Sequence, residues 1–249
     1  MEHPLSILYH PVNRLLIAIF GESGETYQSL MGLHSAGYWL PDNAIMSMLV
    51  VIVVAAILIP VSRKLSVESP RKLQSMLEIL LTGLEDLIED VVGHGNGKRF
   101  LPLICGLAFF IFIGNIFGIF YFVQPPTADL STTFALSITA FVFYNVVGIR
   151  KNGLWNYLKH FAGPLPLLAP LMVPIEIISH LARILSLALR LFGNIFGEHT
   201  ATGIFFSMFP FILPWPMMGL GIFGSFLQAF IFIMLTMAYL NGAVGAEEH

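Results

Sequence analysis

The chain has 249 residues, of which 56% are hydrophobic and 11% are charged. Soluble globular domains carry about 25% charged residues, so this composition excludes a soluble protein and indicates an integral membrane protein. The formal net charge of -3 argues against nucleic-acid binding, and the single cysteine, Cys105, excludes a disulfide framework.

Residues 1–42 contain no apolar run of bilayer length and are predicted to form a peripheral N-terminal arm on the outer side of the membrane. The early cation Arg14 is followed by about six apolar residues, which is too short for the core of a secretory signal, and no small-residue cleavage site follows. Residues 43–249 are predicted to form one membrane domain. Its first span covers residues 44–62 and is closed by the cations Arg63 and Lys64.

The stretch 71–92 has the period of an amphipathic helix, with apolar side chains on one face and acidic side chains over the rest. The apolar face consists of Leu73, Met76, Leu77, Leu80, Leu84, Leu87, Ile88 and Val91. Such a helix is predicted to lie in the plane of the membrane surface or against other helices, and not to cross the bilayer. Its acidic residues form either a solvated face or a docking surface.

The sequence GHGNGKR at residues 93–99 has to be compared with a phosphate-binding loop. One residue is missing between the outer glycine and Gly97, and Arg99 stands where that motif needs Ser or Thr. We therefore expect a flexible turn at this position and no bound nucleotide.

Four further spans are predicted, at residues 100–123, 130–149, 170–199 and 217–241. Asn115 and Asn145 are the main polar interruptions of the first two, and Asp129 is expected to cap the helix that begins at Leu130. The predicted fold is an all-α integral membrane protein with five membrane-embedded helices and one in-plane amphipathic helix.

Lys and Arg residues gather in residues 63–99 and 150–160, whereas the turns at residues 124–129 and 205–216 have none. The positive-inside rule places the two cation-rich segments in the cytoplasm. With five crossings, the N-terminus is then predicted to lie outside and the C-terminus in the cytoplasm.

Residues 176–199 place ionisable groups within an apolar run, and such groups inside a bilayer mark an ion or substrate pathway. At about 100° per residue, six polar side chains fall within about 40° of the direction of the first of them. These six are Glu176, His180, Arg183, Arg190, Asn194 and Glu198. His199 lies at about 140° from this stripe. Beside it Ser179, Ser186 and Gly193 recur every seven residues, a spacing that lets another helix approach closely.

Arg190 keeps its proton under physiological conditions, so it cannot relay protons but can repel them and attract a carboxylate. Glu176, Glu198 and the histidines can exchange protons. Carriers on both sides of a fixed cation predict a proton path that is interrupted at Arg190. The last span offers a matching polar face within about 120°, made of Gly221, Gly224, Ser225, Gln228, Thr236 and Tyr239.

At these residues the chain resembles subunit a of the F-type ATP synthases. The matching motifs are LRLFGN at residues 189–194 and LQAFIF at residues 227–232, with Tyr239 eleven residues beyond Gln228. The likeness covers roughly residues 40–246 and includes the amphipathic helix and the sequence PTAD that ends at Asp129.

The resemblance implies that Arg190 faces a rotating ring of c subunits, separates two offset aqueous half-channels and couples proton translocation to rotation and ATP synthesis. Asn194 and Gln228 would flank the arginine, Gln228 would orient it, and Tyr239 would belong to the same pathway. The cytoplasmic half-channel would be lined by Glu176, Ser179 and His180, and the outer one by Asn115 with Glu198 or His199.

The resemblance also implies the partners, which are the c-subunit ring, the subunit b stalk, the remaining ATP synthase subunits and membrane lipid. The chain would be non-catalytic, because the ATP chemistry resides on other subunits, and would hold no cofactor, metal or nucleotide. It would be a multi-pass protein of the bacterial plasma (inner) membrane. Its last two helices would form a long hairpin, strongly tilted along the ring.

The chain departs from the family pattern at the outer end of the pathway. Bacterial relatives usually carry a glutamate nine residues after the arginine, where this chain has His199, with Glu198 at eight. Mitochondrial relatives also use histidine there and pair it with an acid seven residues before the glutamine, a position that is Gly221 here. Glu198 and His199 therefore compete for the role of outer proton carrier.

Two other classes of protein fit the sequence less well. A self-contained transporter would need internal repeats or paired broken helices, and the sequence shows no repeat. An intramembrane enzyme would need a histidine base near Ser225 or a metalloprotease motif, and the last span has neither. Glu176 and His180 have metal-ligand spacing, but two ligands make a weak site. Arg183 is interpreted as a cytoplasmic-side cation that either snorkels toward the membrane surface or pairs with Glu176.

Overall fold

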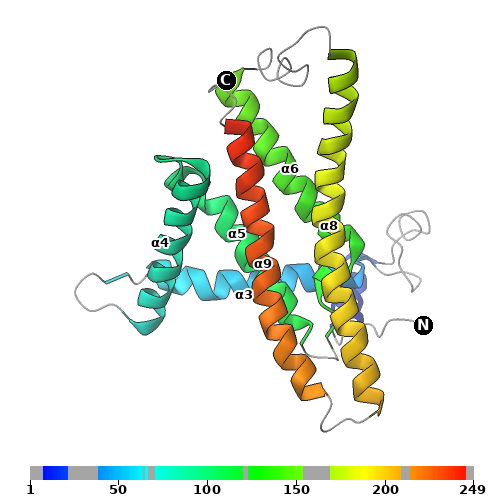
Figure 1. Ribbon diagram of the computed structural model, residues 1–249. Helices are drawn as coiled ribbons and strands as arrows, with labels where there is room; N and C mark the ends of the chain where they lie inside the picture. Colours follow the sequence, from blue (N-terminus) through cyan, green and yellow to red (C-terminus); the bar gives the residue numbers. More distant parts are fainter. Residues whose placement is uncertain are drawn as a thin grey trace.

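The computed structural model describes residues 8–21, 39–63, 65–66, 71–119, 123–153, 169–208 and 214–244. Within these ranges the chain forms seven α-helices, one short 3₁₀ turn and no strand (Figure 1). Five of the described helices are long and apolar enough to cross a membrane. The prediction of an all-α membrane protein with five membrane-embedded helices is therefore confirmed.

The helices follow the predicted order along the chain. They are α1 (Tyr9–Phe20), α3 (Asp42–Arg63), α4 (Lys72–Val92), α5 (Gly97–Phe117), the 3₁₀ turn η1 (Pro126–Ala128), α6 (Leu130–Asn152), α8 (Ala169–Met208) and α9 (Pro214–Val244). The amphipathic stretch forms α4. Residues 154–160 of the second cation-rich segment and the acidic end of the chain lie outside the described residues.

The N-terminal arm contains a helix, α1, that the sequence did not predict, because its apolar run is too short to span a bilayer. Asn13 lies at its centre and is completely buried. Its Oδ1 accepts hydrogen bonds from the backbone N–H groups of Trp39 and Leu40, both at 2.9 Å. The indole N–H of Trp39 in turn donates to the carbonyl of Gly21 at 2.8 Å. These bonds hold the segment before α3 against α1.

The apolar run at residues 100–123 contains both the end of α5 and the turn that follows it. The helix ends at Phe117. The turn after it is closely packed, because a Cβ atom at Gly118 would lie 3.0 Å from Cγ of Pro125 and 3.1 Å from the carbonyl oxygen of Asn115. A larger residue at this position would require its neighbours to move by a few tenths of an ångström.

Asp129 caps the N-terminus of α6, as predicted. Its Oδ1 accepts a hydrogen bond from the backbone N–H of Ser131 at 2.8 Å. The hydroxyl of Ser131 donates to the same oxygen at 2.6 Å and accepts from the amide of Asn43 at 2.7 Å. The cap therefore also ties the first turn of α6 to the first turn of α3.

The last two helices are much longer than a bilayer is thick. α8 has 40 residues and α9 has 31. At about 1.5 Å per residue they measure about 60 Å and about 46 Å, against about 30 Å of hydrocarbon. α8 continues beyond residue 199, where the predicted span ends, and residues 200–208 hold no proline that would stop it. Helices of this length must tilt to stay within the bilayer.

The arrangement of the helices agrees with such a tilt (Figure 1). α8 and α9 form an antiparallel pair that packs side by side, and α3 runs crosswise to both. α3 has 22 residues and is about 33 Å long. An upright helix of this length matches the hydrocarbon thickness of a bilayer. If α3 stands along the membrane normal, the α8–α9 hairpin lies strongly tilted.

The hydrophobic core lies among α5, α6, α8 and α9, with the end of α4 at its edge. Its fully buried side chains include Ile88, Phe100, Ile104, Ile111, Leu191, Met237 and Leu240. Burial of each such side chain contributes roughly 1.5–3 kcal/mol. This core fixes the inward sides of α8 and α9 and leaves their other sides exposed.

The C-terminal end of α9 is bound to the C-terminal end of α6. The Lys151 ammonium donates to the carbonyl of Val244 at 3.0 Å, and the Asn152 amide donates to the carbonyl of Ala243 at 3.1 Å. The last carbonyls of a helix have no partners within that helix, so side-chain donors stabilise them. We refer to these two bonds as the α6–α9 tie.

Replacing Asn152 with alanine is expected to lower the free energy of unfolding by roughly 1–3 kcal/mol, because a largely buried carbonyl loses its donor. The thermal midpoint of the detergent-solubilised protein would measure the change. Arg150→Ala removes an exposed side chain two positions away and serves as the control. Equal midpoints for Asn152→Ala and the control would show that the tie does not stabilise the fold.

Candidate ion-pathway site

Arg190 is exposed on α8 and makes no hydrogen bond or ion pair with any residue that the structure describes. The neighbouring small residues Ser186, Gly193 and Gly197 are exposed as well. A Cβ atom added at Gly193 or Gly197 would meet no described atom within 4 Å. The permanent cation therefore lies beside a smooth, open surface of α8.

One hydrogen bond joins α8 to α9 next to this cation. The Asn194 amide donates to Oε1 of Gln228 at 2.7 Å. Asn194 lies one turn beyond Arg190, and Gln228 is 2% exposed. The structure thus brings Asn194 and Gln228 together, and their bond fixes the two helices at the level of the arginine.

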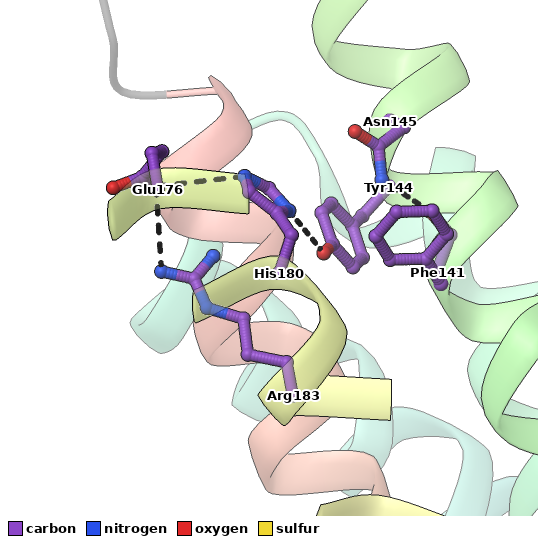
Figure 2. A network of polar contacts seen from close by, with 6 residues as sticks. All are labelled: Phe141, Tyr144, Asn145, Glu176, His180 and Arg183. Carbon is purple, nitrogen blue, oxygen red and sulfur yellow. Dashed lines mark hydrogen bonds and ion pairs between the residues drawn. The ribbon is translucent and has the colours of Figure 1, made fainter. Parts of the chain in front are cut away.

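A group of polar side chains gathers near the beginning of α8 (Figure 2). Nε2 of His180 lies 3.5 Å from Oε1 of Glu176, and the Arg183 guanidinium lies 4.0 Å from the same oxygen. The other ring nitrogen of His180, Nδ1, is 2.9 Å from the hydroxyl of Tyr144 on α6. Of the two interpretations of Arg183, this contact agrees with pairing to Glu176.

Tyr239 completes this group from α9. The guanidinium carbon of Arg183 lies 5.2 Å from the centre of the Tyr239 ring, a cation–π distance. The rings of Tyr144 and Tyr239 are 5.9 Å apart. We call Tyr144, Glu176, His180, Arg183 and Tyr239 the inner cluster.

The members of the inner cluster differ in exposure and include one residue that the sequence did not point to. Glu176 and Arg183 are about one third exposed, whereas His180 is buried. Ser179 is half-buried on α8 beside them. Tyr144 was not predicted, although a tyrosine within an apolar span is itself a signal, because its buried hydroxyl needs a hydrogen-bond partner. In the described part of the chain no three potential ligands gather around Glu176 and His180.

The structure separates Glu198 and His199, the two residues at the C-terminal end of the stripe. The Glu198 carboxylate lies against α9, where a Cβ atom at Gly221 would collide with its Oε1 and one at Gly224 would lie 3.3 Å from its Oε2. His199 points toward α5, and its Nδ1 lies 3.4 Å from the carbonyl oxygen of Gly118. The glycine at residue 221 therefore makes room for the glutamate.

Buried polar atoms lie near this end of the stripe. Asn115 is 2% exposed, and neither its amide nitrogen nor its amide oxygen has a partner within the described ranges. The hydroxyls of Thr127 and Ser225 are also buried and unpaired there. Buried polar groups are normally hydrogen-bonded to protein or to water, so these atoms suit ordered water.

The fold and the site together define a multi-pass α-helical membrane protein with a line of ionisable groups along its longest helix. The family model described as ATP synthase A chain matches residues 44–241 of the chain. The chain belongs to this family.

Relatives from several bacteria agree with the family match. ATP synthase subunit a 1 of Syntrophotalea carbinolica is 41% identical over 244 residues, which make up 98% of this chain and 98% of that protein. ATP synthase subunit a of Nitratiruptor sp. is 45% identical over 179 residues, or 72% of this chain and 79% of the relative. ATP synthase subunit a of Geobacter sulfurreducens is 45% identical over 175 residues, or 70% and 76% of the two chains.

Proposed function

We propose that the chain forms two offset proton half-channels against a ring of c subunits, and that Arg190 separates them. The observation that carries this proposal is the exposed guanidinium, which has no partner within the described residues and lies beside a line of small residues. An unpaired charge at bilayer depth is costly, so a partner that supplies a carboxylate fits this surface. Small side chains there would let a helix of that partner approach closely.

A fixed cation at this position would do two things. It would favour the ionised form of each ring carboxylate that comes opposite, so the carboxylate would release its proton before passing. It would also repel a proton that moved directly from one half-channel to the other. The hydrogen bond between Asn194 and Gln228 would keep α8 from sliding along α9. Arg190 would then stay at a constant position along the hairpin.

The inner half-channel would begin at the partly exposed Glu176, with Ser179, His180 and Tyr239 near it. Glu176 lies fourteen residues, or about 21 Å, from Arg190 along α8. The outer half-channel would use the water-suited polar atoms around Asn115. We assign the outer proton carrier to Glu198, since its carboxylate faces α9, and we assign His199 to the contact with α5.

The remaining features extend the proposal to the whole complex. The chain would itself be non-catalytic and would contact the c-ring, the subunit b stalk and lipid. The relatives come from bacteria, which supports the bacterial plasma membrane as its location. The cation-rich segments support an outside N-terminus and a cytoplasmic C-terminus.

Reconstitution tests this function. In vesicles with an imposed pH gradient, the chain alone is expected to conduct no protons, because its half-channels are offset and join only through the ring. Addition of the c-ring and subunit b is expected to permit proton flow, which a pH-sensitive dye inside the vesicles measures. Vesicles with the ring and subunit b but without the chain are the control. Conduction by the chain alone would instead favour a self-contained transporter.

A further inference from the structure

We propose that Tyr144 is a positioning residue that holds His180 so that its Nε2 exchanges a proton with Glu176. Tyr144 lies on α6, outside the helix that carries the stripe. The proposal rests on the proposed function, because it gives one side of the inner half-channel a defined step of proton transfer.

The geometry fixes the imidazole from several directions (Figure 2). The hydroxyl of Tyr144 lies 2.9 Å from Nδ1 of His180, and the two rings stack at 6.0 Å with an interplanar angle of 23°. The ring of Phe141 meets His180 edge-on, with the centroids 5.9 Å apart. Tyr144 is 2% exposed and His180 is 9% exposed, so water competes little for these contacts. The imidazole is thereby held with its Nε2 toward Glu176.

A tyrosine hydroxyl suits both charge states of this imidazole. It donates to a bare Nδ1 and accepts from a protonated one, whereas a phenylalanine ring does neither. When Nδ1–H donates to Tyr144, Nε2 carries a lone pair that faces Oε1 of Glu176 at 3.5 Å. A proton on that oxygen can then move to Nε2, so that an O–H bond breaks and an N–H bond forms. The products are a carboxylate and an imidazolium whose two N–H groups both have partners.

The charges around Glu176 and His180 favour passage of the proton over its storage on the imidazole. Arg183, on the same helix, is a permanent cation that shares Oε1 of Glu176 at 4.0 Å. Tyr144 from α6 and Tyr239 from α9 are the titratable groups that the neighbouring helices contribute. An imidazolium at His180 is therefore attracted by one carboxylate and repelled by one guanidinium. Repulsion by the guanidinium opposes storage of the proton on the imidazole.

The test uses the complete ATP synthase in vesicles. Tyr144→Phe keeps the buried ring and removes only the hydroxyl, so the complex is expected to assemble normally. Proton pumping driven by ATP is expected to fall roughly three- to tenfold, which corresponds to the loss of one hydrogen bond at a transfer step. The pH at which pumping is half-maximal is expected to shift, because His180 loses its partner. Tyr9→Phe, which alters a tyrosine of the N-terminal arm, is the matched control.

A double-mutant cycle decides whether the hydroxyl acts through the histidine. In a His180→Gln background, Tyr144→Phe is expected to have no further effect on the rate or on the pH profile. An equal loss in both backgrounds would overturn the proposal, and so would an unchanged rate and profile in the single variant. These failures differ from a failure of the proposed function, which would appear as coupled pumping in an Arg190→Ala complex.

Discussion

Replacing Arg190 with alanine is expected to abolish ATP synthesis driven by a proton gradient, while the complex still assembles. The guanidinium is exposed and has no partner among the described residues, so the fold of the chain does not depend on it. Its proposed partner is the carboxylate of a moving ring. Loss of an electrostatic group that acts only at the critical step typically costs a factor of about 100 to 1,000 in rate.

The same variant is expected to increase passive proton leak, because it removes the cation that repels protons between the two half-channels. ATP synthesis and the decay of an imposed pH gradient, measured on the same vesicles, report the two effects. Arg150→Ala removes an exposed cation at the end of α6 and should change neither quantity. Normal synthesis in the Arg190→Ala complex would remove the basis of the proposed function.

Glu198→Gln is expected to slow proton uptake from the outer side by about tenfold or more, since a proton carrier is replaced by a group that cannot titrate. His199→Gln is expected to have a smaller effect, because that side chain faces α5 and the carbonyl of Gly118. The rate of ATP synthesis measures uptake when it is followed as a function of the pH in the compartment to which the outer half-channel opens. A large effect of His199→Gln with none of Glu198→Gln would reverse the assignment, and negligible effects of both would show that neither carries protons.

A glycine substitution gives an independent check on Glu198. At Gly221 an added Cβ would collide with Oε1 of Glu198, the far end of a flexible side chain, so the carboxylate would move and the helices would stay. Gly221→Ala should therefore slow uptake in the same direction as Glu198→Gln. Gly219→Ala is the matched control, because its added Cβ would meet no described atom within 4 Å. Equal rates for the two alanine variants would argue against the position of the carboxylate.

Much of the fold could be predicted from the sequence, because long apolar runs and a cap such as Asp129 are local signals. The end of α5 could not, since the packing of Gly118 against Pro125 involves residues on two sides of a turn. Helix α1 could not be predicted from hydropathy, because hydropathy identifies membrane spans and a helix of twelve residues is too short to span a bilayer. The crosswise direction of α3 depends on packing among helices, which the apolar pattern of one helix does not contain.

The candidate site, too, could be predicted from the sequence only in part. Helical periodicity alone placed Glu176 and Arg190 on one stripe and His199 off it, which agrees with the direction in which His199 points. The family resemblance implied that Asn194 and Gln228 flank Arg190, but their bond to each other could not be predicted, because two helices can align in many registers. Tyr144 lies on a helix without charges in its centre, so only the folded structure revealed that its hydroxyl meets His180.

The α6–α9 tie has a mechanical consequence. A rotor whose carboxylates are attracted and released at Arg190 would exert an equal and opposite push on the hairpin at every step. Axial sliding of α9 would break the bonds from Lys151 and Asn152, so these bonds would transmit the push into α6. The torque that the hairpin can withstand would then depend on the α6–α9 tie, which takes no part in proton transfer.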